Sequence, residues 1–350
     1  MLRKIKASGL AVGMYVVDTG LSGLEHPYLY SREGEVPDAG AIREILAAGY
    51  AEVFVDSEKG AFGRARESVG HEQAESLAEA PGGVSEASPT PPRAAREPLD
   101  RELAAASHLY TDCLSIARDL LHDVKAGGEI NLKASEDLVD DVIASAMRNP
   151  DALIALSKLR LHDAYTFTHG VNVSALAVAF GGALGLGMAP LKELGLAGLF
   201  HDLGKTGVPD AILNKPGRLT PVEFDRIKRH PGLGRRILAG RGVPEAVLRG
   251  VAEHHEKVNG QGYPAGLAGE AVHPFGRILG VADVFDALTS RRAYKEAMLP
   301  TRALGVLYGM RGTDFPAELV ERFIKFLGPY PVGSFVHLVT GEYGFGCGSN

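Results

Sequence analysis

Hydrophobic periodicity disappears between residues 57 and 98, and this loss divides the sequence into two parts that we expect to be separate domains. The residues in between are mostly Glu, Ala, Gly, Ser and Pro, and they end in the run SPTPP at 88–92. A segment of this composition cannot bury enough apolar surface to offset the entropy lost on ordering. We therefore expect a linker at 57–98, stiff at its proline-rich end, between a small domain at 1–56 and a larger domain at 99–350.

The larger part carries a helical pattern from residue 99 to about residue 328. Its first apolar stripe stops at Gly127 and comprises Leu103, Ala106, Tyr110, Cys113, Ala117, Leu120 and Val124. A second helix is expected at 135–147. Thr220 and Glu223 form a capping box around Pro221, and Pro244 opens a helix that leads to two adjacent histidines. The pattern predicts an all-α bundle.

The two ends of the chain predict strands. Within 1–56 we expect extended segments at 14–17 and 28–30, a helix with Asp38 as N-cap and Gly49 as its stop, and a strand at 52–55. This is a small α+β domain without visible chemistry. Residues 331–346 alternate and are interrupted by turn residues in the manner of a β-hairpin. The expected fold is mainly α with short β elements at both ends.

Composition limits the classes of function. The formal net charge of -6 over 350 residues argues against a protein that binds DNA or RNA without regard to sequence, because such binding needs a basic surface. No run reaches the roughly 18 apolar residues of a membrane helix. The N-terminal apolar stretch is interrupted by Gly9 and Gly13 and lacks a cleavage site, so we interpret it as strand and turn. Cys113, far from Cys347, is expected as a buried thiol in a cytoplasmic protein.

Candidate metal ligands dominate the chemistry of the larger part. They are His169, His201, Asp202, His230, His254, His255 and Asp283. Imidazole nitrogen and carboxylate oxygen bind Zn, Fe and Mn, and these side chains are more than one ion needs. Two ions about 3.5 to 4 Å apart suit hydrolysis of a phosphate ester. The set predicts a dinuclear metallohydrolase.

Each ligand is a weak signal when it is taken alone. His169 shares a helical face with apolar residues, and a core histidine without a metal would be the ordinary interpretation. On a helix, His201 and Asp202 would lie about 100° apart, so that the imidazole serves one ion and the carboxylate lies between two. Asp283 has apolar neighbours and needs a cation or dense hydrogen bonds. Lys205, one turn after His201, is expected near a phosphate or a leaving oxygen, with a surface lysine as the alternative.

The order and spacing of these motifs resemble the HD-GYP family, a branch of the HD-domain phosphohydrolases. The resemblance covers about 160–325. It includes HDLGK at 201–205, LNKPG at 213–217, HP at 230–231, HHE at 254–256, GQGYP at 260–264 and Asp283, followed by Arg292 to Lys295. Residues 1–56 also resemble the small domain of unknown role often fused to HD-GYP domains, through GMYV at 13–16 and EVFVD at 52–56.

The resemblance implies a bacterial phosphodiesterase that converts cyclic di-GMP to pGpG, and in some members to GMP. Its metals are commonly iron or manganese, with zinc, nickel or magnesium as alternatives. The ligands would be the set given above, with Asp202 bridging and Lys205 directed at the scissile group. Arg292 and Lys295 would hold substrate phosphate. The loop Gly262, Tyr263 and Pro264 would contact substrate or diguanylate cyclase domains, and plain turn geometry is the alternative.

Three positions depart from the family pattern. Members with three metals usually carry a glutamate where this chain has Tyr165, which favours two metals here. Where the family usually has an aspartate after the histidine pair, this chain has Asn259. The change would weaken a hydrogen bond to the metal ligands from outside the coordination sphere. The proline expected after Arg292 is Ala293.

Three functions compete. The first is hydrolysis of cyclic di-GMP by a hydroxide shared between the two ions. The second is a cyclic di-GMP receptor or protein-interaction module that turns over slowly or never, although degenerate relatives usually lose a ligand. The third, hydrolysis of nucleoside triphosphates or other nucleotides by an HD phosphohydrolase, is disfavoured because those enzymes lack the segment at 259–264. The helix at 101–125 could form a dimer stalk, but packing on its own bundle is favoured.

Overall fold

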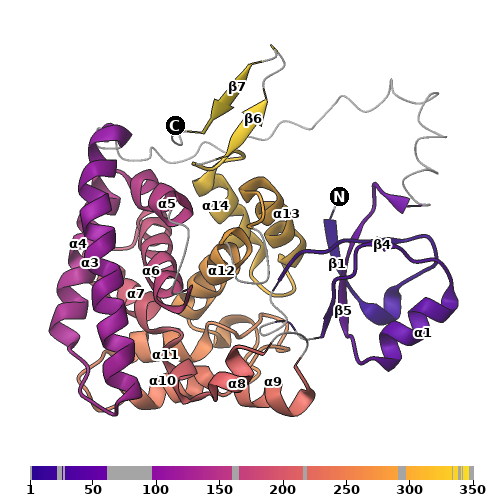
Figure 1. Ribbon diagram of the computed structural model, residues 1–350, viewed down its shortest axis with the longest axis horizontal. Coiled ribbons are helices and arrows are strands. Elements are labelled where there is room, and N and C mark those ends of the chain that lie inside the picture. The colour runs from indigo at the N-terminus through magenta and orange to yellow at the C-terminus, as the bar shows by residue number, and fades with distance from the viewer. Residues whose placement is uncertain are drawn as a thin grey trace. The chain divides into compact units, whose positions relative to one another are not determined.

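The computed structural model describes residues 2–21, 26, 28–60, 97–159, 165–215, 219–290, 297–332, 334–337, 340 and 342–346. The chain divides into two compact units (Figure 1). One unit comprises Met1–Asp18 and Tyr28–Glu97, and the other comprises Thr19–Pro27 and Pro98–Asn350. The boundaries expected at 56 and 98 remain predictions, and most of the expected linker lies outside the described residues.

Among the described residues, the first unit is a small sheet with one α-helix. Its strands run in the order β1 (Leu2–Lys6), β5 (Glu52–Asp56), β2 (Tyr15–Val16) and β4 (Gly34–Glu35), and β3 (Leu29–Tyr30) also pairs with β5. The segments 13–16 and 52–56 that carry the family resemblance contain the neighbouring strands β2 and β5. A short 3-10 helix, η1 (Ala7–Gly9), follows β1. The two-residue strand β4 was not predicted, because it is too short to alternate.

Helix α1 (Ala39–Ala47) begins and ends where the sequence predicts. The Asp38 carboxylate accepts a hydrogen bond of 2.9 Å from the backbone N–H of Ala41, and Gly49 adopts a φ of 77° that favours glycine. Ile45 faces the sheet and joins a core that contains Val16 and Val53. The first unit therefore has a hydrophobic core of its own.

The second unit is a bundle of helices. Its first half contains α3 (Leu99–Lys125), α4 (Leu132–Arg148), α5 (Pro150–Leu159), α6 (Tyr165–Ala183) and α7 (Met188–Phe200). Figure 1 shows α3 and α4 along one side of the bundle, with α6 and α7 inside it. Cys113 on α3 is 1% exposed, as expected for a buried thiol. Every residue of α6 from 169 to 181 is buried, so this part of the helix is enclosed by other elements on all sides.

The second half of the unit supplies the remaining helices and a hairpin. They are η2 (Leu203–Gly207), α8 (Asp210–Leu213), α9 (Pro221–Ile227), α10 (His230–Leu238), α11 (Glu245–Glu253), η3 (Gly269–Ala271), α12 (Pro274–Thr289), α13 (Pro300–Met310) and α14 (Ala317–Leu327), followed by the strands β6 (Phe335–His337) and β7 (Tyr343–Phe345). The strands are antiparallel, with Phe335 opposite Phe345. The mainly α fold with a C-terminal hairpin is confirmed.

Local capping signals explain several helix ends. Thr220 and Glu223 form both hydrogen bonds of the predicted capping box at the start of α9. Helix α4 begins three residues before the predicted start, because the Asn131 side chain accepts a hydrogen bond from the N–H of Ala134 at 3.0 Å and acts as the N-cap. Within the described residues, none of the helices combines the length and apolar character needed to cross a bilayer.

Candidate metal centre

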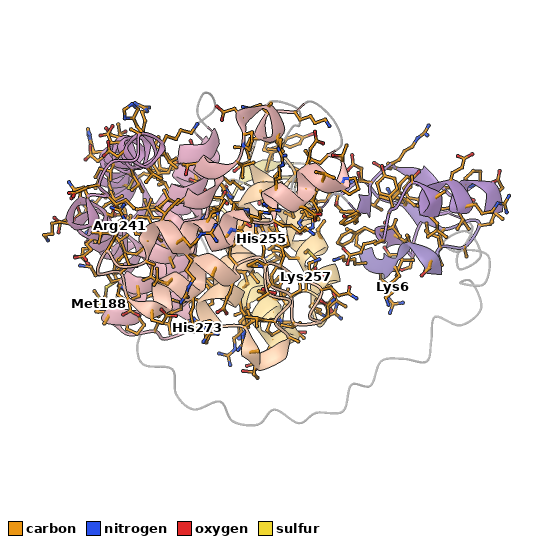
Figure 2. All side chains as sticks on the ribbon, turned by 90° about the horizontal axis from the view of Figure 1, so that it is seen from below. Lys6, Met188, Arg241, His255, Lys257 and His273 are labelled. Carbon is orange, nitrogen blue, oxygen red and sulfur yellow. The ribbon has the colours of Figure 1, made fainter. Side chains whose placement is uncertain are left out.

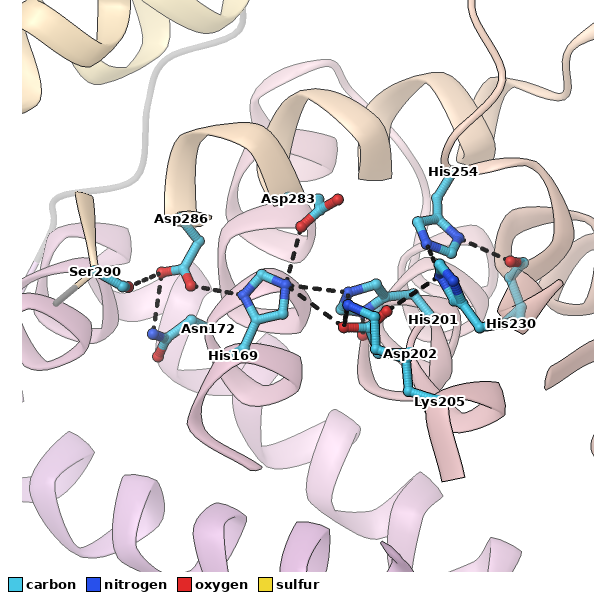
Figure 3. A network of polar contacts seen from close by, with 12 residues as sticks. His169, Asn172, His201, Asp202, Lys205, His230, His254, Asp283, Asp286 and Ser290 are labelled. Atoms are coloured by element: carbon cyan, nitrogen blue, oxygen red, sulfur yellow. Dashed lines mark hydrogen bonds and ion pairs between the residues drawn. The ribbon is translucent and has the colours of Figure 1, made fainter. Parts of the chain in front are cut away.

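The predicted ligands lie on or just after five helices of the second unit and meet in one row, of which Figure 3 labels every member except the half-buried His255. Helix α6 supplies His169, and α12 supplies Asp283. The end of α7 supplies His201, and the following turn supplies Asp202. His230 begins α10, and His254 and His255 follow the end of α11. His169, His201, His230 and His254 are each at most 2% exposed.

Asp202 lies between two groups of ligands. Its Oδ2 atom is 3.4 Å from His201 Nε2 and 3.8 Å from His169 Nε2, whereas its Oδ1 atom is 3.3 Å from His230 Nε2. On one side, His169 Nε2 is 2.9 Å from Asp283 Oδ1. On the other side, His230 Nε2 is 3.2 Å from His254 Nε2. One carboxylate therefore faces both halves of the row.

Backbone contacts fix how three of the rings point. The Nδ1 atoms of His201, His230 and His254 lie 2.7 to 2.8 Å from carbonyl oxygens three residues earlier, on Gly198, Ile227 and Val251. A carbonyl only accepts, so each Nδ1 carries the proton and each Nε2 presents a lone pair. The facing Nε2 atoms of His230 and His254 would repel each other in this tautomer. A cation between them removes that repulsion.

Unsatisfied buried atoms indicate the same chemistry. Asp202 Oδ1 and His255 Nε2 are buried without a hydrogen-bond partner among the described residues. Buried polar atoms are normally paired, so each needs an explanation. Ligand atoms within 4.8 Å of one another form three overlapping groups: His169 with His201 and Asp283, His201 with Asp202 and His254, and His230 with His254 and His255. The donor set and its spacing fit divalent metal ions.

The pKa shifts of most predicted ligands favour the protonation states that metal binding requires. Burial lowers the pKa of His230 to about 4, against the opposing charge of Asp202. Burial and neighbouring imidazoles hold the pKa of His254 and His255 well below the usual value. Although burial would raise the pKa of Asp202, the charge of the neighbouring Lys205 ammonium and contacts with nearby imidazoles hold it well below its usual range. Near neutral pH, Asp202 is ionised and these three rings are neutral, as metal coordination requires.

His169 has the opposite charge state without metal. Burial alone would lower its pKa, but hydrogen bonds to Asp283 and Asp286 raise the pKa to about 10. Its Nδ1 atom lies 2.8 Å from Asp286 Oδ2, which leaves Nε2 facing Asp283 and the row. A metal ion at this end must therefore displace a proton from His169.

Lys205 lies next to the central carboxylate. Its Nζ atom is 2.7 Å from Asp202 Oδ2. The residues 201–205 are not one continuous helix as predicted, because α7 ends at Phe200 and Asp202 precedes η2. The cause lies in tertiary packing. A Cβ atom on Gly204 would lie 1.9 Å from the carbonyl oxygen of His230, so the chain must turn closely over α10 at a glycine.

The segment around Tyr263 packs against a ligand. The Tyr263 ring stacks on the ring of His255, with centroids 4.7 Å apart and planes at 30°. Its backbone N–H donates to the carbonyl oxygen of His255 at 3.2 Å. A Cβ atom on Gly262 would lie 2.3 Å from the backbone nitrogen of Lys257, which explains the glycine. Pro264 follows through a cis peptide bond and is exposed. His255 lies among the side chains of the helical unit in Figure 2.

Two acidic residues beside the row were missed by sequence reasoning. Asp286 contacts His169, and its position three residues after Asp283 on α12 could have identified it. Glu256 accepts hydrogen bonds from the backbone N–H groups of Ala265 and Leu267, at 2.6 and 2.9 Å, and so holds the loop that follows Tyr263. Glu256 belongs to the quoted motif, but its spacing alone indicates no role.

The departures from the family pattern fall in different places. Asn259 is exposed, and its side chain accepts a hydrogen bond from the N–H of Gln261 at 2.9 Å, so it shapes a turn. Arg292, Ala293 and Lys295 lie outside the described residues, as does the side chain of Tyr165. The predicted roles of Arg292 and Lys295 in substrate binding remain predictions.

Comparisons with known proteins agree with the predicted family and fold. Residues 142–319 match the family model described as HD domain, and residues 2–135 match a domain of unknown function, DUF3391. The chain is 37% identical over 346 residues to the cyclic di-GMP phosphodiesterase PA4108 of Pseudomonas aeruginosa, which covers 98% of this chain and 81% of that protein.

Two further similarities cover different shares of the chain. It is 43% identical over 145 residues to the cyclic di-GMP phosphodiesterase response regulator RpfG of Xanthomonas campestris, covering 41% of this chain and only 38% of that protein. The solved structure of Bd1817, an HDG"Y"P protein from Bdellovibrio bacteriovorus, has a TM-score of 0.54 at 18% identity. It covers 93% of this chain and 99% of that one, and it supports the fold alone.

The helical bundle and its row of histidines and aspartates define an HD-domain hydrolase. The chain belongs to the HD-GYP family of cyclic di-GMP phosphodiesterases, with a DUF3391 domain preceding the HD domain. The predicted family, fold and phosphodiesterase class are confirmed.

Proposed function

We propose that this protein hydrolyses cyclic di-GMP at two divalent metal ions held by the ligand row. The observation that carries the proposal is the buried Asp202 carboxylate, whose two oxygens face different groups of histidines. A carboxylate in that position can bridge two ions. The names of the relatives support cyclic di-GMP as the substrate.

The ligands divide naturally into two ends. His169, His201 and Asp283 would hold one ion, and His230, His254 and His255 would hold the other, with Asp202 shared. Imidazole and carboxylate donors suit iron and manganese, which we expect as the native metals. Bound there, the ions would activate water as a nucleophile and neutralise phosphate oxygens.

The chain's own residues would complete the reaction. The Lys205 ammonium is 17% exposed and pairs with Asp202, so its charge lies at the edge of the row. There it would stabilise negative charge that develops on the phosphate or the leaving 3′-oxygen. Tyr263, held against His255, would form part of the wall that the substrate meets. The expected product is pGpG, with GMP as the product of a second cleavage.

The alternative is a receptor that binds cyclic di-GMP without turnover. The convergence of all the predicted ligands, with Lys205 beside them, favours the enzyme because a receptor needs no nucleophile or leaving-group assistance. Contacts of Gly262, Tyr263 and Pro264 with diguanylate cyclase domains, and a homodimer, remain further predictions.

Product analysis tests the proposal. Protein purified without oxygen and loaded with Fe²⁺ or Mn²⁺ should convert cyclic di-GMP to pGpG, as followed by chromatography. A Lys205→Met variant should retain its metal but lose most of the rate, because the substitution removes the ammonium and its hydrogen bond to Asp202 but none of the proposed metal ligands. Binding of cyclic di-GMP without product in either metal would favour the receptor. A faster reaction with a mixed guanine–adenine cyclic dinucleotide would reassign the substrate.

A further inference from the structure

A chain of buried hydrogen bonds joins helix α3 to the metal ligand His169. The Tyr110 hydroxyl donates to Asn172 Oδ1 at 2.6 Å, and Asn172 Nδ2 donates to Asp286 Oδ1 at 3.0 Å. Asp286 Oδ2 lies 2.8 Å from His169 Nδ1. Tyr110, Asn172, Asp286 and His169 are all at most 3% exposed. Figure 3 shows the part of this chain from Asn172 to His169.

His169 is held differently from three of its fellow ligands. His201, His230 and His254 direct Nδ1 at backbone carbonyls three residues earlier, so their own turns orient them. His169 instead directs Nδ1 at a side chain on another helix, α12. A carboxylate behind a ligating imidazole fixes the tautomer and strengthens the ligand. The orientation of His169 therefore depends on where Asp286 is held.

Asp286 is held in turn by donors from α6 and from its own helix. Asn172 Nδ2 and the Ser290 hydroxyl, at 3.1 Å, both donate to Asp286 Oδ1. The amide of Asn172 can offer its N–H to Asp286 only while its oxygen faces the other way, towards the Tyr110 hydroxyl. The hydroxyl on α3 thus selects the amide orientation that Asp286 requires.

We propose that Asp286, Asn172 and Tyr110 are positioning residues for His169, and that they couple helix α3 to metal occupancy at the His169 end of the row. This inference rests on the proposed two-ion site. The other end, at His230, His254 and His255, has no member in this chain of hydrogen bonds. Breaking these hydrogen bonds should therefore lower the affinity for the ion at the His169 end and leave the affinity for the other ion unchanged.

Metal titration of three full-length variants tests the inference. Asp286→Asn offers His169 an amide in place of the carboxylate, and we expect the affinity for the ion at the His169 end to fall about 10- to 100-fold. Tyr110→Phe removes one hydroxyl, and we expect a smaller loss at the same end. The matched control is Ser145→Ala, which removes a buried hydroxyl bonded at 2.7 Å to Glu102 on the same α3 helix.

Calorimetry measures the number of Mn²⁺ ions bound and their affinities. Electron paramagnetic resonance detects the spin-coupled signal of a manganese pair. The inference predicts that Asp286→Asn and Tyr110→Phe keep one tight ion and lose the coupled signal at limiting Mn²⁺, whereas Ser145→Ala behaves as the parent. Variants that bind both ions as tightly as the parent would overturn it, as would equal loss of both ions or an equal effect of Ser145→Ala. If the parent itself binds no metal, the proposed function fails instead.

Discussion

At the scale of single residues, Asp202 is the group on which the site depends most. It is 8% exposed, and its carboxylate faces Lys205 and histidines from both halves of the row. A buried carboxylate without compensating charge is strongly unfavourable. The Lys205 ammonium balances the negative charge of Asp202. The carboxylate oxygens of Asp202 still have lone pairs left, and these could coordinate two bridged cations.

Replacing Asp202 by asparagine should therefore lower the affinity for both ions more than replacing a residue, such as Asp286, that only contacts a ligand. We expect the metal affinity of Asp202→Asn to fall by more than the roughly 100-fold that loss of an outer partner can cost, with hydrolysis falling in parallel. Elemental analysis after dialysis measures the metal. Asp210→Asn is the control, because it removes one negative charge from an exposed side chain of α8 that contacts only Lys125 among the ion pairs of the described residues. Full metal content in Asp202→Asn would contradict the bridging role.

Protonation of the buried rings should make the metal-free protein sensitive to acid. The pKa of His230 is about 4 in the folded protein, whereas its ordinary value is 6.5. Between pH 6.5 and 4, His230 is therefore protonated in the unfolded chain but neutral in the folded protein. The free energy of unfolding should fall as the pH drops through this window. His254 and His255 shift in the same direction.

His169 contributes with the opposite sign. Its folded pKa of about 10 stabilises the metal-free protein fully below 6.5, and this contribution is lost as the pH rises towards 10. Denaturant unfolding in the presence of a chelator, repeated across both windows, measures both effects. A His230→Gln variant cannot titrate and should lose part of the acid sensitivity. Stability that increases on acidification from 6.5 would contradict these charge states.

At the scale of elements, the close contact between η2 and α10 sets the distance between Asp202 and His230. A Cβ atom at Gly204 would lie 2.5 Å from the backbone nitrogen of Gly234 as well as against the His230 carbonyl. These atoms belong to backbone and cannot move aside alone. The Gly204→Ala substitution should therefore separate η2 from α10.

We expect Gly204→Ala to lower the free energy of unfolding by about 1 to 3 kcal/mol, as overpacking does elsewhere, and to weaken metal binding. Gly207→Ala is the matched control on the same 3-10 helix, since its added methyl would meet only the Leu233 side chain, at 3.3 Å. Thermal unfolding and metal titration of both variants measure the effects. Equal metal affinity in the two variants would show that this contact does not set the site.

Elements whose signals are local were predictable, and those that depend on distant packing were not. The Thr220 capping box and the helix stop at Gly49 need only neighbouring residues, and both are as expected. The break after Phe200 depends on a contact between Gly204 and residue 230, which no periodicity reveals. Likewise, the role of Asp286 follows only when α6 and α12 are known to be neighbours.

At the scale of the whole molecule, the chain combines two units with separate cores. The strands and α1 of the first unit enclose Val16, Ile45 and Val53. All of the predicted metal ligands belong to the second unit. The change of composition at 57–98 predicts a linker whose boundaries stay predictions, and the histidines beyond it predict metal chemistry, because both signals are present in the sequence without any knowledge of packing.

In the proposed site, one row of ligands in the second unit holds two ions that share Asp202. Anomalous X-ray scattering from crystals of protein purified without oxygen and loaded with Mn²⁺ tests it most directly. We expect two manganese peaks in the helical unit, both next to Asp202. One should lie against His169, His201 and Asp283, and the other against His230, His254 and His255. A single peak, or peaks away from Asp202, would contradict it.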